Sequence, residues 1–174
     1  MYFKYIPDMY YKDIYNIDYD SLRKKDIKCI IFDLDNTLAP LCDKEPSNEL
    51  KDLIKRVDYL GFKIVILSNA TKKRVQPFKE ILNVDSAYMA HKPSKKKYKK
   101  VLEMYDLHPE QIACIGDQLF TDIKGANRMG MVSILTDKLA KKDHILSYYN
   151  RFKEIFVFRK FKKEKILIKG EYYD

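Results

Sequence analysis

The sequence predicts an α/β fold in three layers, with five parallel strands in a central sheet and helices on both faces. Two observations predict it. Short runs of four or five residues, rich in Ile and Val, alternate with longer segments of helical periodicity. Runs that are apolar at nearly every position are typical of strands buried on both faces of a parallel sheet. The runs occupy 29–32, 63–67, 86–90, 112–116 and 131–135.

Four helices are predicted around these strands. In the first, apolar residues recur at three- and four-residue intervals from Leu50 to Leu60, and Gly61 follows as a terminator. In the third, Ser94 is suited to be the N-cap. The repeated strand–helix–strand order places helices on both faces of the sheet, and ligands of such sheets bind at the carboxyl ends of the strands. The predicted helices span 47–60, 72–82, 94–105 and 121–129.

The chain divides into a core, residues 28–136, and two flanking segments. Residues 1–27 form an aromatic N-terminal arm with six tyrosines, which we expect to fill grooves of its own domain. Residues 137–174 form a basic C-terminal extension, packed on or beside the core. Within it, 151–169 mixes basic and apolar residues and is compatible with a helix or with an edge strand. Contact with an anionic membrane and packing on the core are both open.

The charge balance indicates an anionic partner but not which kind. The chain has 34 Lys+Arg against 25 Asp+Glu, a formal net charge of +9, and 46% hydrophobic residues, which excludes a wholly disordered chain. No apolar run approaches the ~18 residues of a membrane-spanning helix, and the first residues do not resemble a signal peptide. The three cysteines form no CxxC pair. We expect a cytoplasmic protein, with a peripheral position at the inner membrane surface as an open alternative.

The first predicted strand runs directly into FDLDNTL, which places Asp33 and Asp35 at its carboxyl end. Two carboxylates one residue apart can divide phosphoryl transfer between them. One attacks phosphorus and forms an aspartyl-phosphate, while the other donates and later removes a proton. A carboxylate that approaches a phosphate dianion needs a cation to offset the repulsion, and Mg²⁺ is the usual one. DxDxT alone occurs by chance in many chains.

Further polar residues follow the other strands. Ser68, in ILSNAT, is suited to hold phosphate oxygens together with backbone N–H groups, or simply to cap the next helix. Lys92, after the short third strand, is placed to neutralise a phosphate and to hold carboxylates together. In IGDQLFTD, Asp117 offers an oxygen ligand for Mg²⁺, and Asp122 either orients the site or stabilises a helix N-terminus.

In this order, the four motifs resemble those of the haloacid-dehalogenase (HAD) superfamily of phosphatases. DLDNT matches the first motif, the LSN serine the second, the KP lysine the third and GDQLFTD the fourth. The resemblance covers about residues 28–136 and implies a Rossmann-like core. The implied roles are Asp33 as nucleophile, Asp35 as general acid/base, Ser68, Asn69 and Lys92 as phosphate-binding residues, Mg²⁺ held by Asp33, the backbone carbonyl of Asp35 and Asp117, and Asp122 and Thr37 as supporting residues.

A narrower resemblance extends beyond these motifs. Segments 6–38 and 116–130 look like the YqeG family of HAD phosphatases, which is similar to mitochondrial phosphatidylglycerophosphate phosphatases. This resemblance implies a Mg²⁺-dependent phosphomonoester hydrolase that works through an aspartyl-phosphate on phosphatidylglycerophosphate.

The intervals between motifs leave no room for an inserted cap domain. Residues 39–46 separate the first motif from the next helix, and one helix and one short strand lie between Asn69 and Lys92. We therefore expect a capless enzyme with an open pocket, unless another subunit covers it, suited to a bulky, lipid-borne phosphate. Two alternatives are a phosphatase of nucleic-acid ends or another bulky phosphorylated substrate, and a non-catalytic RNA- or membrane-binding module. No recognised nucleic-acid module favours the first, paired aspartates argue against the second, and the oligomeric state is not predicted.

Overall fold

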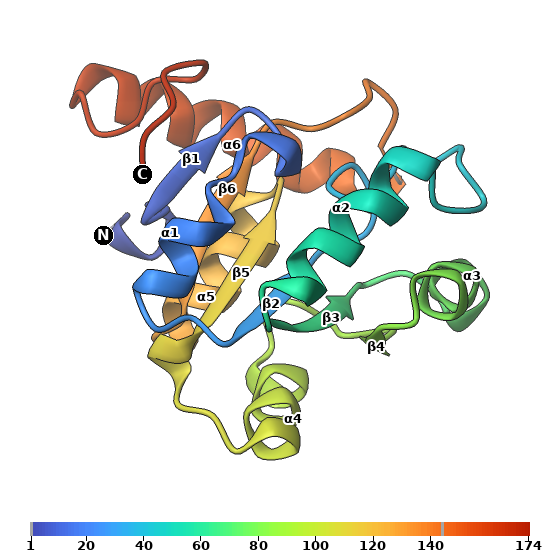
Figure 1. The fold of residues 1–174 in the computed structure, drawn as a ribbon. Coiled ribbons are helices and arrows are strands. Elements are labelled where there is room, and N and C mark those ends of the chain that lie inside the picture. The colour runs from blue at the N-terminus through green and yellow to red at the C-terminus, as the bar shows by residue number, and fades with distance from the viewer. Residues whose placement is uncertain (1, 144) are drawn as a thin grey trace.

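The computed structural model describes residues 2–143 and 145–174. Over these residues, six parallel strands form one sheet in the order β1-β6-β5-β2-β3-β4 (Figure 1). The parallel α/β class is thus confirmed, but the predicted number of five strands is wrong. The strands are β1 (Met9–Tyr11), β2 (Cys29–Phe32), β3 (Lys63–Leu67), β4 (Asp85–Ala87), β5 (Ile112–Gly116) and β6 (Val132–Thr136).

The additional strand, β1, comes from the aromatic N-terminal arm. It pairs with β6, with Tyr10 opposite Leu135. Asp8 fixes its start, since its carboxylate accepts hydrogen bonds from the backbone N–H of Ser133 (2.8 Å) and from its hydroxyl (3.0 Å). At the outer edge, Tyr10 and Tyr173 exchange two backbone hydrogen bonds. Because β1 has only three residues and partners more than 100 residues away, no local pattern in the sequence indicated it.

Successive side chains of the central strands pack into hydrophobic clusters on opposite faces of the sheet. In β2, Ile30 and Phe32 lie in a cluster on one face of the sheet, whereas Cys29 and Ile31 lie in a second cluster on the other. This alternation follows from the two-residue period of a strand. It explains why the strand is apolar at every position, and it confirms that helices cover both faces.

The helices are α1 (Tyr19–Lys24), α2 (Asn48–Tyr59), α3 (Lys72–Leu82), α4 (Lys95–Tyr105), α5 (Lys124–Met129) and α6 (Ile145–Lys163). The first three pack on one face, and α4 and α5 on the other. The hydroxyl of Ser47 caps α2 by accepting a hydrogen bond from the N–H of Leu50 (3.1 Å). The predicted helix over 121–129 instead begins with a π-helical turn, η4 (Leu119–Ile123), before α5.

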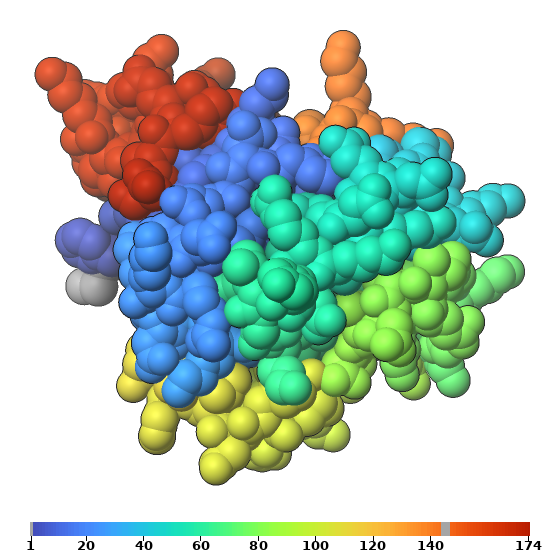
Figure 2. Space-filling model, viewed as in Figure 1, coloured from blue at the N-terminus to red at the C-terminus, as the bar shows by residue number. Residues whose placement is uncertain are grey.

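The C-terminal extension packs on the core as a long helix and a tail. Of the two readings of 151–169, the helix is the observed one over most of this segment, because α6 extends to Lys163. Phe161 and Val157 of α6 form a third buried cluster with Tyr10 and Leu135. In the space-filling view the C-terminal segment lies against the N-terminal arm (Figure 2). Among the described residues, no helix combines the length and apolar character needed to cross a membrane.

We expect Phe161→Ala to lower the free energy of unfolding by about 3–5 kcal/mol, because it leaves a cavity between α6 and the sheet. Urea unfolding followed by circular dichroism measures the change. Phe152→Ala on the same helix is the matched control: its ring is 60% exposed, so the change should stay within about 0.5 kcal/mol. Similar losses in both variants would contradict the packing of α6 on the core.

Candidate active site

Three adjacent strands deliver the predicted motifs to one edge of the sheet. Asp33 follows β2, Ser68 follows β3 and Asp117 follows β5, and β2 pairs with both of the others. A cavity of about 490 Å³ lies at this edge. Five of the predicted site residues line it: Asp33, Asp35, Ser68, Asn69 and Lys92. Their chemical roles remain predictions, but the structure brings all five to one pocket.

Lys92 joins two carboxylates at the centre of the site. Its ammonium nitrogen lies 2.6 Å from Oδ1 of Asp33 and 2.7 Å from Oδ1 of Asp122, and all three side chains are buried. Burial opposes the charge of Lys92, but Asp122 and Asp33 outweigh burial and raise its pKa. Burial likewise raises the pKa of the Asp33 carboxyl, against the effect of Lys92. Asp33 is therefore a carboxylate whose charge depends on nearby cations.

Side-chain hydrogen bonds fix the backbone around Lys92 and Ser68. The side-chain oxygen of Asn69 accepts a hydrogen bond from the backbone N–H of Lys92 (2.7 Å). The hydroxyl oxygen of Ser68 accepts one from the N–H of Ala70 (3.1 Å). Ser68 and Asn69 both line the pocket, so each can fix the nearby backbone and still face a bound phosphate.

Gly116 allows Asp122 to approach the end of β5. A Cβ atom at position 116 would lie 2.3 Å from Cγ of Asp122, so no larger residue fits. The second carboxylate oxygen of Asp122 accepts a hydrogen bond from the N–H of Gln118 (3.2 Å). Asp122 thus contacts both Lys92 and the turn that follows β5, and its functional role stays a prediction.

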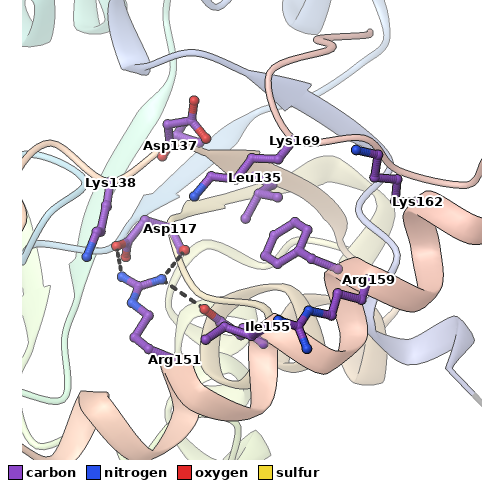
Figure 3. Close-up of a pocket in the computed structure, with 12 residues that line it drawn as sticks. Asp117, Leu135, Asp137, Lys138, Arg151, Ile155, Arg159, Lys162 and Lys169 are labelled. Carbon is purple, nitrogen blue, oxygen red and sulfur yellow. Dashed lines mark hydrogen bonds and ion pairs between the residues drawn. The ribbon is translucent and has the colours of Figure 1, made fainter.

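Asp117 is paired with a residue that the sequence did not single out. Arg151 of α6 forms an ion pair with Oδ2 of Asp117 and donates to its backbone carbonyl (2.7 Å) (Figure 3). Thr37 donates a hydrogen bond to Oδ1 (3.4 Å). Burial raises the pKa of Asp117, and Arg151 opposes this shift. In the sequence, Arg151 is one of many basic residues near the C-terminus, so nothing distinguished it.

Asp35 is also held by an arginine. Nε of Arg74 lies 2.8 Å from Oδ1 of Asp35, and Arg74 itself is fixed by the carbonyl oxygens of Pro40 (3.1 Å) and Asp43. Arg74 lies in the first turn of α3 after two lysines, and nothing in the sequence distinguished it from them.

The C-terminal extension forms one wall of the pocket. Asn36, in the left-handed backbone region, bonds through its side chain to the carbonyl of Lys142 (2.9 Å) and to the carboxylate of Asp143 (3.0 Å). Asp143, together with Ser147 and Asn150 of α6, lines the cavity. The pocket is therefore bounded on one side by the C-terminal extension of the same chain. The described residues contain no inserted cap, but α6 crosses this edge of the sheet (Figure 1).

The charges of the site fit a divalent metal ion. Ligand oxygens of Asp33, Asp117 and Asp122 all lie within 4.8 Å of one another. Three buried carboxylates face two cations, Lys92 and Arg151. This leaves an excess of negative charge, and carboxylate oxygens are the ligands that Mg²⁺ prefers. Asp33 and Asp117 are the predicted ligands, and Asp122 belongs to the same cluster.

Comparison with known proteins identifies the family. The family model described as "Mitochondrial PGP phosphatase" matches residues 3–140. The chain belongs to this family. A Bacillus subtilis relative named "Probable phosphatase YqeG" is 34% identical over 147 residues, which cover 84% of this chain and 86% of the relative. The Arabidopsis thaliana protein "Phosphatidylglycerophosphate phosphatase 1, chloroplastic/mitochondrial" is 26% identical, over 79% of this chain and 42% of its own length.

Solved structures show the same fold for this PGP phosphatase family member. D,D-heptose 1.7-bisphosphate phosphatase from B. bronchiseptica, complexed with magnesium and phosphate, matches with a TM-score of 0.52 and 19% identity, over 63% of this chain and 80% of that one. An uncharacterized protein from Listeria monocytogenes serotype 4b matches with a TM-score of 0.52 and 22% identity, over 68% and 86%. The predictions of a HAD-type fold, the YqeG family and a phosphoric monoester hydrolase are confirmed.

We expect Lys92→Met to lower the free energy of unfolding by about 3–5 kcal/mol at pH 8, because Asp33 and Asp122 lose their shared cation. The loss should shrink toward pH 5. Burial raises the pKa of Asp33, and the variant removes the lysine that opposes this shift, so the pKa of Asp33 lies above that of the unfolded chain. Lowering the pH therefore protonates Asp33 and favours the folded state. Urea unfolding without divalent cations, at both pH values, measures the effect.

The matched control is Lys99→Met, which replaces an exposed lysine of α4. It should change the free energy of unfolding by less than about 0.5 kcal/mol at either pH. A loss in Lys92→Met that does not vary with pH would contradict the assignment of Lys92 as the cation shared by the two carboxylates.

Proposed function

We propose that the chain is a Mg²⁺-dependent phosphomonoester hydrolase that forms an aspartyl-phosphate on Asp33 and acts on phosphatidylglycerophosphate. The observation that carries the proposal is the contact of Lys92 with Asp33 at the floor of a pocket, in a member of a PGP phosphatase family. A nucleophile beside a cation at the carboxyl edge of a parallel sheet is suited to phosphoryl transfer.

The two carboxylates of the first motif divide the reaction. Lys92 engages Oδ1 of Asp33, which leaves Oδ2 to attack phosphorus while the bond from phosphorus to the alcohol oxygen breaks. Asp35 gives a proton to that leaving oxygen. Asp35 then takes a proton from water, whose oxygen attacks phosphorus, and the bond to Asp33 breaks. Inorganic phosphate leaves, and both carboxyl groups return to their starting states.

The surrounding residues bind and orient the reacting groups. Lys92 and Ser68 hold phosphoryl oxygens, and Arg74 keeps the carboxylate of Asp35 at the pocket wall. Mg²⁺, held by Asp33, Asp117 and the backbone carbonyl of Asp35, would offset the repulsion between the carboxylates and the phosphate dianion.

The exposed side of α6 supports a lipid-borne substrate. Apolar side chains gather on it beside Ser147 and Asn150 of the pocket, and we call this surface the aromatic face of α6. Phe152 and Phe156, 60% and 54% exposed, lie edge to face, and Lys153 lies over the ring of Tyr149. Aromatic rings with lysines among them suit the interface of an anionic bilayer. The face comprises Tyr148, Tyr149, Phe152, Ile155 and Phe156.

We expect Asp33→Asn to lower kcat for p-nitrophenyl phosphate and for phosphatidylglycerophosphate at least about 1,000-fold, as removal of a nucleophile does, while the circular dichroism spectrum is retained. Phosphate release measures turnover, and EDTA should abolish the wild-type activity until Mg²⁺ is restored. Asp52→Asn, an exposed carboxylate on α2, is the control and should keep full activity. Turnover by Asp33→Asn would overturn the mechanism, and cleavage of the aryl phosphate without the lipid would overturn the substrate.

We expect Phe152→Ser/Phe156→Ser to weaken binding to vesicles of phosphatidylcholine and phosphatidylglycerol at least about tenfold. Each ring contributes about 1.5–3 kcal/mol when fully buried, and half or more of each is exposed in the protein. Vesicle sedimentation measures the bound fraction. Tyr59→Ser removes a ring that is 90% exposed at the end of α2 and should leave binding unchanged. Equal binding by the double variant and wild type would contradict a bilayer contact through α6.

A further inference from the structure

A second cavity, of about 450 Å³, adjoins the ion pair between Asp117 and Arg151 (Figure 3). Its lining comes from the end of β6, from α6 and from the C-terminal tail. The lining residues that matter below are Thr136, Lys138, Phe158, Arg159, Lys162 and Lys169. We call it the α6 pocket. Asp117 and Ile155 belong to its lining, but the cavity itself has no role in the function proposed above.

The carboxylates in the wall of the α6 pocket already have partners within the protein. Asp117 faces Arg151, and Glu154 accepts hydrogen bonds from the N–H of Leu119 (2.6 Å) and from Arg151 (3.1 Å). The third, Asp137, accepts hydrogen bonds from the hydroxyls of two tyrosines. All three carboxylates are thus paired with a cation or hydrogen-bonded. The wall therefore repels an anion less than three unpartnered carboxylates would.

Three basic side chains of the pocket lack such partners. Within residues 2–143 and 145–174, Arg159, Lys162 and Lys169 make no ion pair with a carboxylate. In the close-up, Arg159 and Lys162 lie on one side of the pocket and Lys138 on the other, with the ammonium of Lys169 between them (Figure 3). Lys138 is already paired with Asp143 (3.0 Å), so Arg159, Lys162 and Lys169 are the groups that remain for an anion. Basic groups on several sides of one cavity are suited to bind a phosphate.

Two buried polar atoms at the pocket are also without a partner. The hydroxyl oxygen of Thr136 and Nε of Arg151 make no hydrogen bond to any described residue. Thr136 is only 2% exposed and lines the cavity. A buried hydroxyl or N–H without a partner costs free energy, so such groups are rare in folded proteins and indicate a missing ligand or water.

The remaining wall is apolar. Leu135, Ile155 and Phe158 contribute to the lining, and Lys169 lies over the ring of Phe158. A free inorganic ion would leave this surface uncovered, whereas an anion attached to a hydrocarbon body would cover it. The chemistry of the α6 pocket therefore matches the phosphodiester end of an amphiphile.

The α6 pocket lies within reach of the catalytic pocket. Asn150 lines the catalytic pocket and Glu154 lines the α6 pocket, one turn further along the same helix. Asp117 also links the two cavities, because its carboxylate belongs to the cluster with Asp33 and Asp122 and it lines the α6 pocket as well. A ligand in the α6 pocket therefore lies beside the carboxylates of the candidate active site.

We propose that the α6 pocket binds the phosphodiester of the glycerophospholipid substrate while the terminal phosphate of the same molecule enters the catalytic pocket. This inference rests on the proposed function, and it gives the fold a way to distinguish lipid phosphates with two phosphate groups from simple phosphomonoesters. Arg159 and Lys162 bind the phosphodiester charge, and Thr136 provides a buried hydrogen bond.

A binding experiment tests the pocket without catalysis. Dihexanoylphosphatidylglycerol carries the phosphodiester but no phosphomonoester, and isothermal titration calorimetry measures its dissociation constant. We expect Arg159→Gln/Lys162→Gln to weaken binding at least about tenfold, and the isosteric Thr136→Val to weaken it severalfold, as a lost hydrogen bond does. The control Lys99→Gln/Lys100→Gln removes the same charge from exposed positions of α4 and should bind like wild type. Equal constants for the two double variants would overturn the proposal.

Inorganic phosphate and a short single-stranded oligonucleotide serve as competing probes. If either bound with a lower dissociation constant than dihexanoylphosphatidylglycerol and displaced it, the pocket would be a site for free anions or nucleic acid, and the proposal would be wrong. We expect both to compete only weakly, because neither covers the apolar wall.

Kinetics separate this inference from the proposed function. In Arg159→Gln/Lys162→Gln, the ratio of kcat/KM for short-chain phosphatidylglycerophosphate to kcat/KM for p-nitrophenyl phosphate should fall at least about tenfold, mainly through a higher KM for the lipid. An unchanged ratio would overturn the α6 pocket alone. Wild-type protein that cleaves the aryl phosphate but not the lipid would overturn the lipid substrate, and with it the pocket's role in that reaction.

Discussion

The positive charge supplied to three buried carboxylates is the interaction on which the rest of the site depends. Asp33, Asp117 and Asp122 converge where β2 and β5 end, and like charges in a buried site repel one another strongly. Lys92 is shared between two of them, and Arg151 pairs with the third. One cation comes from the turn after β4 and the other from α6, so segments far apart in the chain must be folded together before the carboxylates are stable as a group.

This requirement gives α6 a structural role that extends beyond its packing. The same helix carries Arg151 to Asp117, contributes Asn150 to the pocket of the candidate active site, and buries Phe161 in the third cluster. In a fold without an inserted cap, a C-terminal helix can form the wall that a cap would otherwise supply. Aromatic rings lie on the exposed side of α6, and basic residues of the same helix line the α6 pocket, both next to the candidate active site. This combination suits a substrate with a charged head and an apolar body.

The sheet was predictable wherever burial on both faces imposed a continuous apolar pattern. The central strands β2, β3 and β5 meet that condition, and the structure has them at the predicted positions. Edge strands are less constrained: β4 is limited to Asp85–Ala87, and β1 has three residues. Both depend on pairing with distant segments rather than on their own composition. The helical state of most of 151–169 was equally undetermined, because its apolar residues do not follow one face.

The sequence by itself determined which residues stand at the ends of the parallel strands, and therefore that Asp33, Ser68, Lys92 and Asp117 approach one another. Parallel pairing forces strand ends of the same polarity to one edge, so order along the chain was sufficient. The sequence also placed Lys92 to hold carboxylates together, but only the tertiary structure decided that Arg74 and Arg151 pair with Asp35 and Asp117. They do so through packing of helices whose docking positions are not encoded in any local spacing. The α6 pocket also depends on the tertiary structure, because it exists only where β6, α6 and the C-terminal tail meet.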